Sequence, residues 1–81
     1  MAAIYVLDVP EFRPIAESAA RQGLSVEKLK SGYLRISSPN ELELVRKPTG
    51  VKLPIWFGAP TGGLEGTITR FDRDVLRVVD P

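Results

Sequence analysis

The sequence predicts an α+β fold in which one helix packs on a curved, mostly antiparallel sheet. Three observations support this fold class. Apolar side chains recur at helical spacing in residues 11–22, the other apolar residues lie in short runs typical of strands, and turn-forming residues separate those runs. With 81 residues, the chain is expected to form a single domain, residues 1–81, with one modest core. The expected order is a strand, the helix, an optional short strand and five further strands.

The first strand and the helix are expected to follow each other closely. Residues 3–9 are mostly aliphatic, β-branched or aromatic, which is typical of a buried strand. Pro14 is compatible only with the first turn of a helix, so the helix should begin near Arg13, and Gly23 should end it. Spacings of three, four, seven and eight residues mark one apolar helix face. Its members are Phe12, Ile15, Ala16, Ala19 and Ala20.

The middle of the chain predicts a hairpin. Residues 24–29 fit either an edge strand or a very short helix that would end before Gly32. Residues 33–38 and 41–47 both alternate apolar and polar side chains, and the Ser-Pro-Asn sequence between them is typical of a turn. We therefore expect these two segments to pair as a hairpin with one dry face and one wet face.

Residues 53–57 hold the only tryptophan and are expected to form an aromatic strand, with Pro54 placing it at a sheet edge or a strand start. Adjacent side chains of a strand point to opposite faces, so Trp56 and Phe57 should not enter the same core. One ring is then available to a partner, and we expect Phe57 to be the more exposed. The glycine-rich residues 58–66 should form a wide turn.

Residues 66–71 and 75–79 are expected to form the last two strands, joined by a tight polar turn. Asp72 and Asp74 in this turn have a spacing that can bind a hard cation, but the neighbouring arginines favour an ordinary solvated turn. The glycines of residues 58–66 lack the lysine and hydroxyl pair of a phosphate loop, and β-branched residues follow them instead of a helix. We therefore expect neither a metal site nor a phosphate loop here.

The composition narrows the possible functions. The chain has neither cysteine nor histidine, and these residues supply most nucleophiles, general bases and transition-metal ligands near neutral pH. We therefore expect no catalytic residue, no metal and no cofactor. Eleven basic against ten acidic residues give a net charge of +1, whereas nucleic-acid binders usually carry a clear basic excess. No apolar run is long enough to span a membrane, so we expect a soluble, cytoplasmic protein.

The residues best suited to a binding site lie in and around the aromatic segment. Aromatic side chains beside adaptable loops are favoured hot spots at protein interfaces. Tyr33 and Arg35 should share one face of the predicted hairpin and, with Tyr5 and Arg46, could line a polar pocket for a small acid, although alternation places Arg46 on the opposite face. The candidate partner-binding residues are Trp56, Phe57, Pro60, Leu64, Tyr33 and Arg35.

Residues 32–46 read GYLRISSPNELELVR: a glycine, two apolar residues, a basic residue, isoleucine, then proline, two spaced leucines and a final arginine. With the strand and helix before it and the glycine-containing turn after it, this segment resembles the small effector proteins of soluble di-iron multicomponent monooxygenases, such as phenol hydroxylase and methane monooxygenase. The resemblance covers residues 14–79. It departs at residues 48–52, where the family has a helix, and residues 56–60 have no counterpart in the family pattern.

The resemblance implies a cofactor-free protein that docks over the active site of the hydroxylase component and tunes oxygen activation and substrate entry. We accordingly predict a non-catalytic accessory protein that binds a larger enzyme. Two alternatives remain open. Residues 19–30 have spacing typical of a helix-turn-helix, which would indicate a small DNA-binding regulator, and Tyr33, Arg35 and residues 58–66 could form a small-ligand-binding domain. Self-association also remains open, because Pro54 suggests an edge strand.

Overall fold

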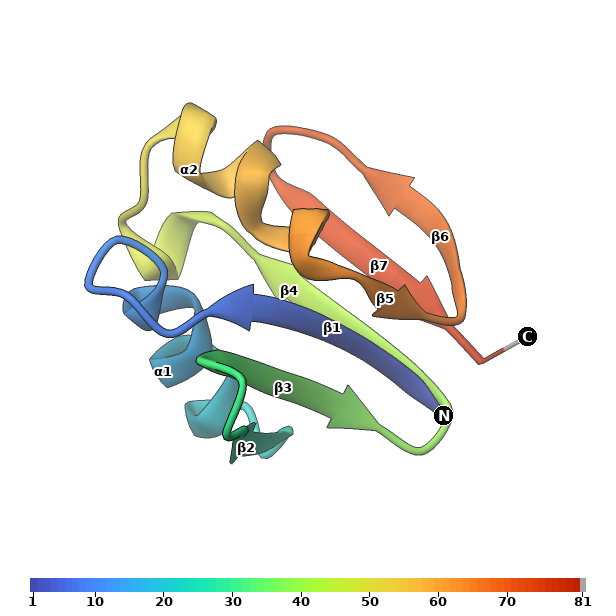
Figure 1. Cartoon of the computed structure of the whole chain (residues 1–81). Helices are drawn as coiled ribbons and strands as arrows, with labels where there is room; N and C mark the ends of the chain where they lie inside the picture. The colour runs from blue at the N-terminus through green and yellow to red at the C-terminus, as the bar shows by residue number, and fades with distance from the viewer. Residues whose placement is uncertain (81) are drawn as a thin grey trace.

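Residues 1–80, which the computed structural model describes, form an α+β fold with two antiparallel sheets, two α-helices and two short 3-10 helices (Figure 1). In chain order the elements are β1 (Ala2–Leu7), α1 (Arg13–Arg21), β2 (Ser25–Lys28), β3 (Tyr33–Ser38), β4 (Glu41–Val45), the 3-10 helix η1 (Lys47–Thr49), α2 (Leu53–Gly58), the 3-10 helix η2 (Ala59–Gly62), β5 (Leu64–Glu65), β6 (Thr67–Phe71) and β7 (Val75–Val79). The first sheet has the order β2-β3-β1-β5 and the second has the order β4-β7-β6. The α+β class is thus confirmed, but the prediction of one helix on one sheet is wrong.

The helix α1 forms where the apolar spacing predicts it. It begins at Arg13, with Pro14 in its first turn, where the missing amide donor has no intrahelical acceptor to lose. It ends before Gly23, whose φ of 89° lies in the left-handed region that glycine adopts with least strain. Ile15 and Ala19 are buried in the core, whereas Ala20, expected on the same face, is exposed.

The two alternating segments form the predicted strands, but they do not pair as a hairpin. β3 pairs with β1 and β2, while β4 pairs with β7 in the other sheet. Alternation fixes which face of a strand is buried and leaves its pairing partner open. Both strands bury their apolar faces in the same core, so the turn at Pro39 carries the chain from one sheet to the other.

The ambiguous segment after α1 is an edge strand. β2 pairs antiparallel with β3 and forms the hairpin that the sequence suggested for β3 and β4. Because residues 25–28 are extended, the second helix of a helix-turn-helix is absent from residues 19–30. The structure therefore contradicts the reason for predicting a DNA-binding regulator.

The aromatic segment is a helix, α2, and the prediction of a strand at residues 53–57 is wrong. Lys52 is extended at its start, and the amide of Trp56 donates to the Lys52 carbonyl at 2.9 Å. Pro54 lies in the first turn, where proline is compatible with a helix as well as with a strand start. A short apolar run does not distinguish a buried strand from a buried helix.

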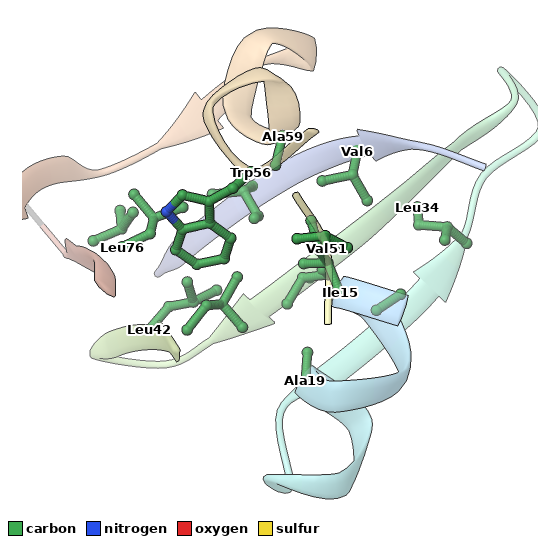
Figure 2. Packing of buried hydrophobic residues seen from close by; sticks show 14 of the residues in the cluster. Val6, Ile15, Ala19, Leu34, Leu42, Val51, Trp56, Ala59 and Leu76 are labelled. Atoms are coloured by element: carbon green, nitrogen blue, oxygen red, sulfur yellow. The ribbon is translucent and has the colours of Figure 1, made fainter. Parts of the chain in front are cut away.

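Most of the buried hydrophobic residues form one cluster that joins both sheets and both helices. Trp56 lies in it near Leu76 and Leu42 of the second sheet, and Ile15 packs on the other side beside Val51 (Figure 2). Residues 1–80 enclose no pocket, and their helices include none long and apolar enough to cross a membrane. The space between helix and sheet is occupied by side chains.

Candidate functional site

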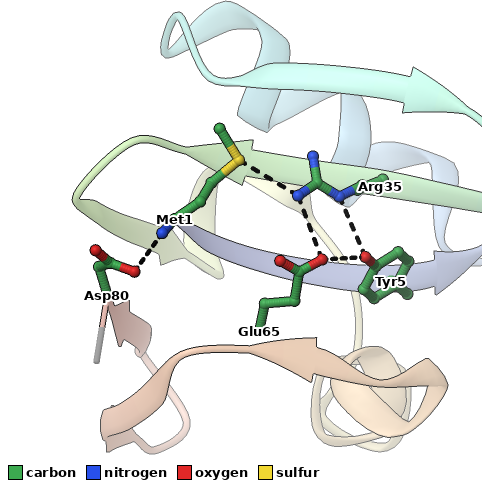
Figure 3. A network of polar contacts seen from close by, with 5 residues as sticks. All are labelled: Met1, Tyr5, Arg35, Glu65 and Asp80. Carbon is green, nitrogen blue, oxygen red and sulfur yellow. Dashed lines mark hydrogen bonds and ion pairs between the residues drawn. The ribbon is translucent and has the colours of Figure 1, made fainter.

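A polar cluster lies on the outer face of the four-stranded sheet (Figure 3). Tyr5 of β1 faces Arg35 of β3 in the strand register, and Glu65 of β5 faces Ala3, two residues before Tyr5 in β1. The Arg35 guanidinium donates from Nε to the Tyr5 hydroxyl at 3.2 Å and from Nη2 to Glu65 Oε1 at 3.3 Å. The Tyr5 hydroxyl in turn donates to Glu65. Three strands are thus linked by one network.

The charges in this cluster neutralise each other. The hydrogen bond from the Tyr5 hydroxyl, and after it the contact with Arg35, lowers the pKa of the Glu65 carboxyl. The hydrogen bond to Tyr5 is the main cause that raises the pKa of Arg35. The sulfur of Met1 contacts the same guanidinium, and its amino group pairs with Asp80. The network holds the strands together and offers a partner no net charge.

The glycine-rich segment closes over the edge of this cluster. A Cβ atom at Gly62 would lie 2.3 Å from the Tyr5 carbonyl oxygen and 2.6 Å from Cε1 of Tyr33, so η2 packs directly on both tyrosines. The small-ligand hypothesis requires an opening at this place, and residues 1–80 have none there. Arg46, which that hypothesis grouped with Tyr5, bonds instead to backbone carbonyls of residues 51 and 73.

A second group of side chains is aromatic and lies between α2 and the end of β6. The ring of Phe71 makes an edge contact with Trp56 at 6.2 Å and a tilted contact with Phe57 at 5.2 Å between centroids. Trp56 is fully buried, and its indole Nε1 donates to the carbonyl of Asp72 at 2.7 Å. Phe57 is 44% exposed, which confirms the prediction that it is the more exposed of the two rings.

The six predicted binding residues therefore do not form one site. Tyr33 and Arg35 lie on the outer face of the first sheet, while Phe57 lies against the second sheet. The others are Trp56 in the core, Pro60, half-buried in η2, and Leu64, exposed in β5.

Sequence reasoning missed Glu65 and Phe71, which complete the polar cluster and the aromatic group. Glu65 lies in a two-residue strand between glycines, too short to show alternation. Phe71 is the last residue of a strand with a bulge at Thr69, and this irregularity changes the face on which the residue lies. The apolar character of Phe71 was the one available signal.

The turn between β6 and β7 has the tight polar form that the sequence predicts. Oδ1 of Asp72 accepts the amides of Asp74 and Val75, each at 2.9 Å, and Oδ2 pairs with Arg70 at 2.7 Å. The Arg70 contact and then the two amides lower the pKa of Asp72 to about 2. The Asp72 carboxylate is thus occupied within its own turn, and no group of three metal-binding side chains occurs in residues 1–80.

No protein-family model and no curated protein matches this chain.

Proposed function

We propose that this chain is a non-catalytic accessory protein that docks on a larger protein through the surface around Phe57. The observation that carries the proposal is the exposed ring of Phe57, held in place by Phe71. An aromatic ring left in water forgoes hydrophobic stabilisation that burial would supply, roughly 1–2 kcal/mol at this degree of exposure.

The setting of Phe57 favours binding. Phe57 directly follows Trp56 in α2. Because Trp56 is anchored in the core, the backbone beneath the Phe57 ring is fixed. Rigid aromatic side chains provide a large contact area at a small cost in conformational entropy, which is why they dominate binding energy at interfaces. Docking through Phe57 would therefore cost little conformational entropy, because the backbone beneath the ring is already fixed.

The resemblance to effector proteins supplies the partner that we propose, the hydroxylase of a multicomponent di-iron monooxygenase. The segment that carries the resemblance, residues 32–46, forms strands in both sheets. Its last residue, Arg46, donates to the carbonyl of Arg73, two residues after Phe71 of the aromatic group. This placement would allow the segment and Phe57 to contact the same partner.

A pull-down from lysate of the source organism tests the proposal. The tagged chain should retain a stoichiometric protein partner, and Phe57→Ala should reduce its recovery several-fold, because the anchor ring is lost. Val26→Ala is the control, since Val26 is 37% exposed but lies on β2, away from α2 (Figure 1). Equal recovery by all three proteins would refute the proposal.

The monooxygenase assignment has its own test. A purified hydroxylase and its reductase should show a changed rate of substrate oxidation when the chain is added, and Phe57→Ala should weaken that response. An unchanged rate, with no complex detected by size-exclusion chromatography, would remove this partner.

A further inference from the structure

Some cations of this chain form ion pairs, and most of the others lie together at one corner of the molecule. Five side chains pair with carboxylates: Arg13, Lys28, Arg35, Arg70 and Arg77. Within residues 1–80, six others form no ion pair: Arg21, Lys30, Arg46, Lys47, Lys52 and Arg73. The last four lie on three chain segments that meet at Arg46.

Arg46 brings these segments together. Its Nε donates to the carbonyl of Arg73 at 2.6 Å, its Nη1 donates to the carbonyl of Val51 at 3.1 Å, and its amide donates to the carbonyl of Asp74 at 2.9 Å. Lys47 follows Arg46 directly and Lys52 follows Val51, so each joined segment adds a cation. We call Arg46, Lys47, Lys52 and Arg73 the cationic corner.

The cationic corner is positively charged and open to solvent. Lys47, Lys52 and Arg73 are exposed, and Arg46 is half-buried. Asp74 is the carboxylate of the joining turn, and it forms no ion pair within residues 1–80; Asp72 is paired with Arg70. Gathering like charges costs electrostatic free energy. A binding partner of opposite charge would offset that cost.

The cationic corner is continuous with the exposed ring. Residues 71–74 contact both the exposed ring and the cationic corner. The ring of Phe71 contacts Phe57, and the carbonyl of Arg73 accepts a hydrogen bond from Arg46. Lys52 lies at the start of α2, whose last turn carries Phe57. These connected segments therefore present an exposed aromatic ring and four cations, and we refer to Phe57 together with the cationic corner as the ridge.

From this arrangement we infer that the ridge binds an acidic segment of a partner protein, with an apolar side chain over Phe57 and carboxylates over the cationic corner. The inference rests on the proposed function and specifies the partner surface. A nucleic acid fits less well: outside the corner, seven basic residues stand against ten acidic ones, and that remainder would repel a long polyphosphate.

Fluorescence anisotropy with a labelled peptide of alternating aspartate and leucine tests the inference, since carboxylates and an apolar side chain are the groups that the ridge should recognise. The full chain should bind this peptide with an affinity that falls as salt is raised. A matched peptide with lysine in place of aspartate should bind far more weakly. The double variant Lys52→Glu/Arg73→Glu should weaken binding of the acidic peptide by about tenfold.

The matched control is Arg21→Glu/Lys30→Glu, which makes the same charge change at the two cations outside the corner that also form no ion pair. It should alter the affinity by less than about twofold. Circular dichroism should show that both double variants are folded. Equal weakening by the two double variants, or equal binding of the two peptides, would overturn the inference.

Two further outcomes separate the possibilities. Tighter binding of single-stranded oligodeoxythymidine than of the acidic peptide would overturn the inference in favour of a nucleic-acid surface. If Phe57→Ala loses the natural partner while Lys52→Glu/Arg73→Glu retains it, the proposed function stands and the inference fails. If neither variant loses the partner, both fail.

Discussion

The carboxylate of Asp72 shows how much one exposed side chain can organise. It accepts two backbone amides and pairs with Arg70, so it fixes the turn that aligns β6 with β7. The same turn supplies the carbonyl that accepts the indole proton of Trp56. The geometry of the turn and the position of the core tryptophan are therefore linked through this residue.

Acid should destabilise the protein partly through Asp72. Its folded-state pKa of about 2 lies below the ordinary 3.8, so its stabilising contribution is present above pH 3.8 and is lost as the pH falls through about 2. Asp72→Asn should lower stability at neutral pH and flatten this acid dependence. Urea denaturation across this pH range measures it. Asp74→Asn is the control in the same turn, because the Asp74 carboxylate accepts no hydrogen bond within residues 1–80. It should lose less stability at neutral pH than Asp72→Asn, and equal losses would contradict the role given to Asp72.

Gly62 is a residue at which one added methyl group should destabilise the fold. In Gly62→Ala the new Cβ would lie 2.3 Å from the Tyr5 carbonyl oxygen, so the backbone must shift, at a cost of about 1–3 kcal/mol in the free energy of unfolding. Gly58→Ala is the matched control, because its Cβ would lie 3.8 Å from Phe12. Thermal and urea denaturation should separate the two, and equal stabilities would contradict the packing described.

At the scale of elements, α2 gives neighbouring rings different roles. Successive helical residues are about 100° apart, so Trp56 enters the core while Phe57 does not. Trp56→Ala should reduce the free energy of unfolding by about 3–5 kcal/mol. Phe57→Ala should reduce it by less than about 1 kcal/mol, because much of that ring is already in water. Urea denaturation of the two variants measures both, and similar losses would show that both rings are structural.

The sequence was sufficient for elements whose signals are local. The start of α1 at Arg13 and its end before Gly23 follow from proline and glycine chemistry, and β7 follows from its β-branched residues. The sequence was insufficient where one pattern is compatible with two structures. Alternation around Leu34 and Leu42 fits a hairpin or two strands facing one core, and the apolar run with Pro54 fits a strand or a helix.

The candidate site shows the same limit, because its geometry depends on tertiary contacts. The exposure of Phe57 was predicted correctly, although from a strand geometry that is wrong. The meeting of Arg46 with Arg73 joins residues 27 positions apart in the chain, and no spacing rule connects them. Tyr5 and Glu65 likewise meet through a sheet order that the sequence does not reveal.

At the scale of the whole molecule, the path of the chain between its two sheets has a kinetic consequence. The pairings of β1 with β5 and of β4 with β7 join segments that are far apart in the chain. The local pairings among residues 1–80 are the hairpins β2–β3 and β6–β7. Closing the sheets must overcome the entropy of bringing distant segments together, which slows folding. We expect the two hairpins to form early and the sheets to close later, in milliseconds to seconds. The single tryptophan, Trp56, lies in the core that the two sheets share. Its stopped-flow fluorescence should therefore report the closing of the sheets. A signal on the microsecond timescale would contradict this order.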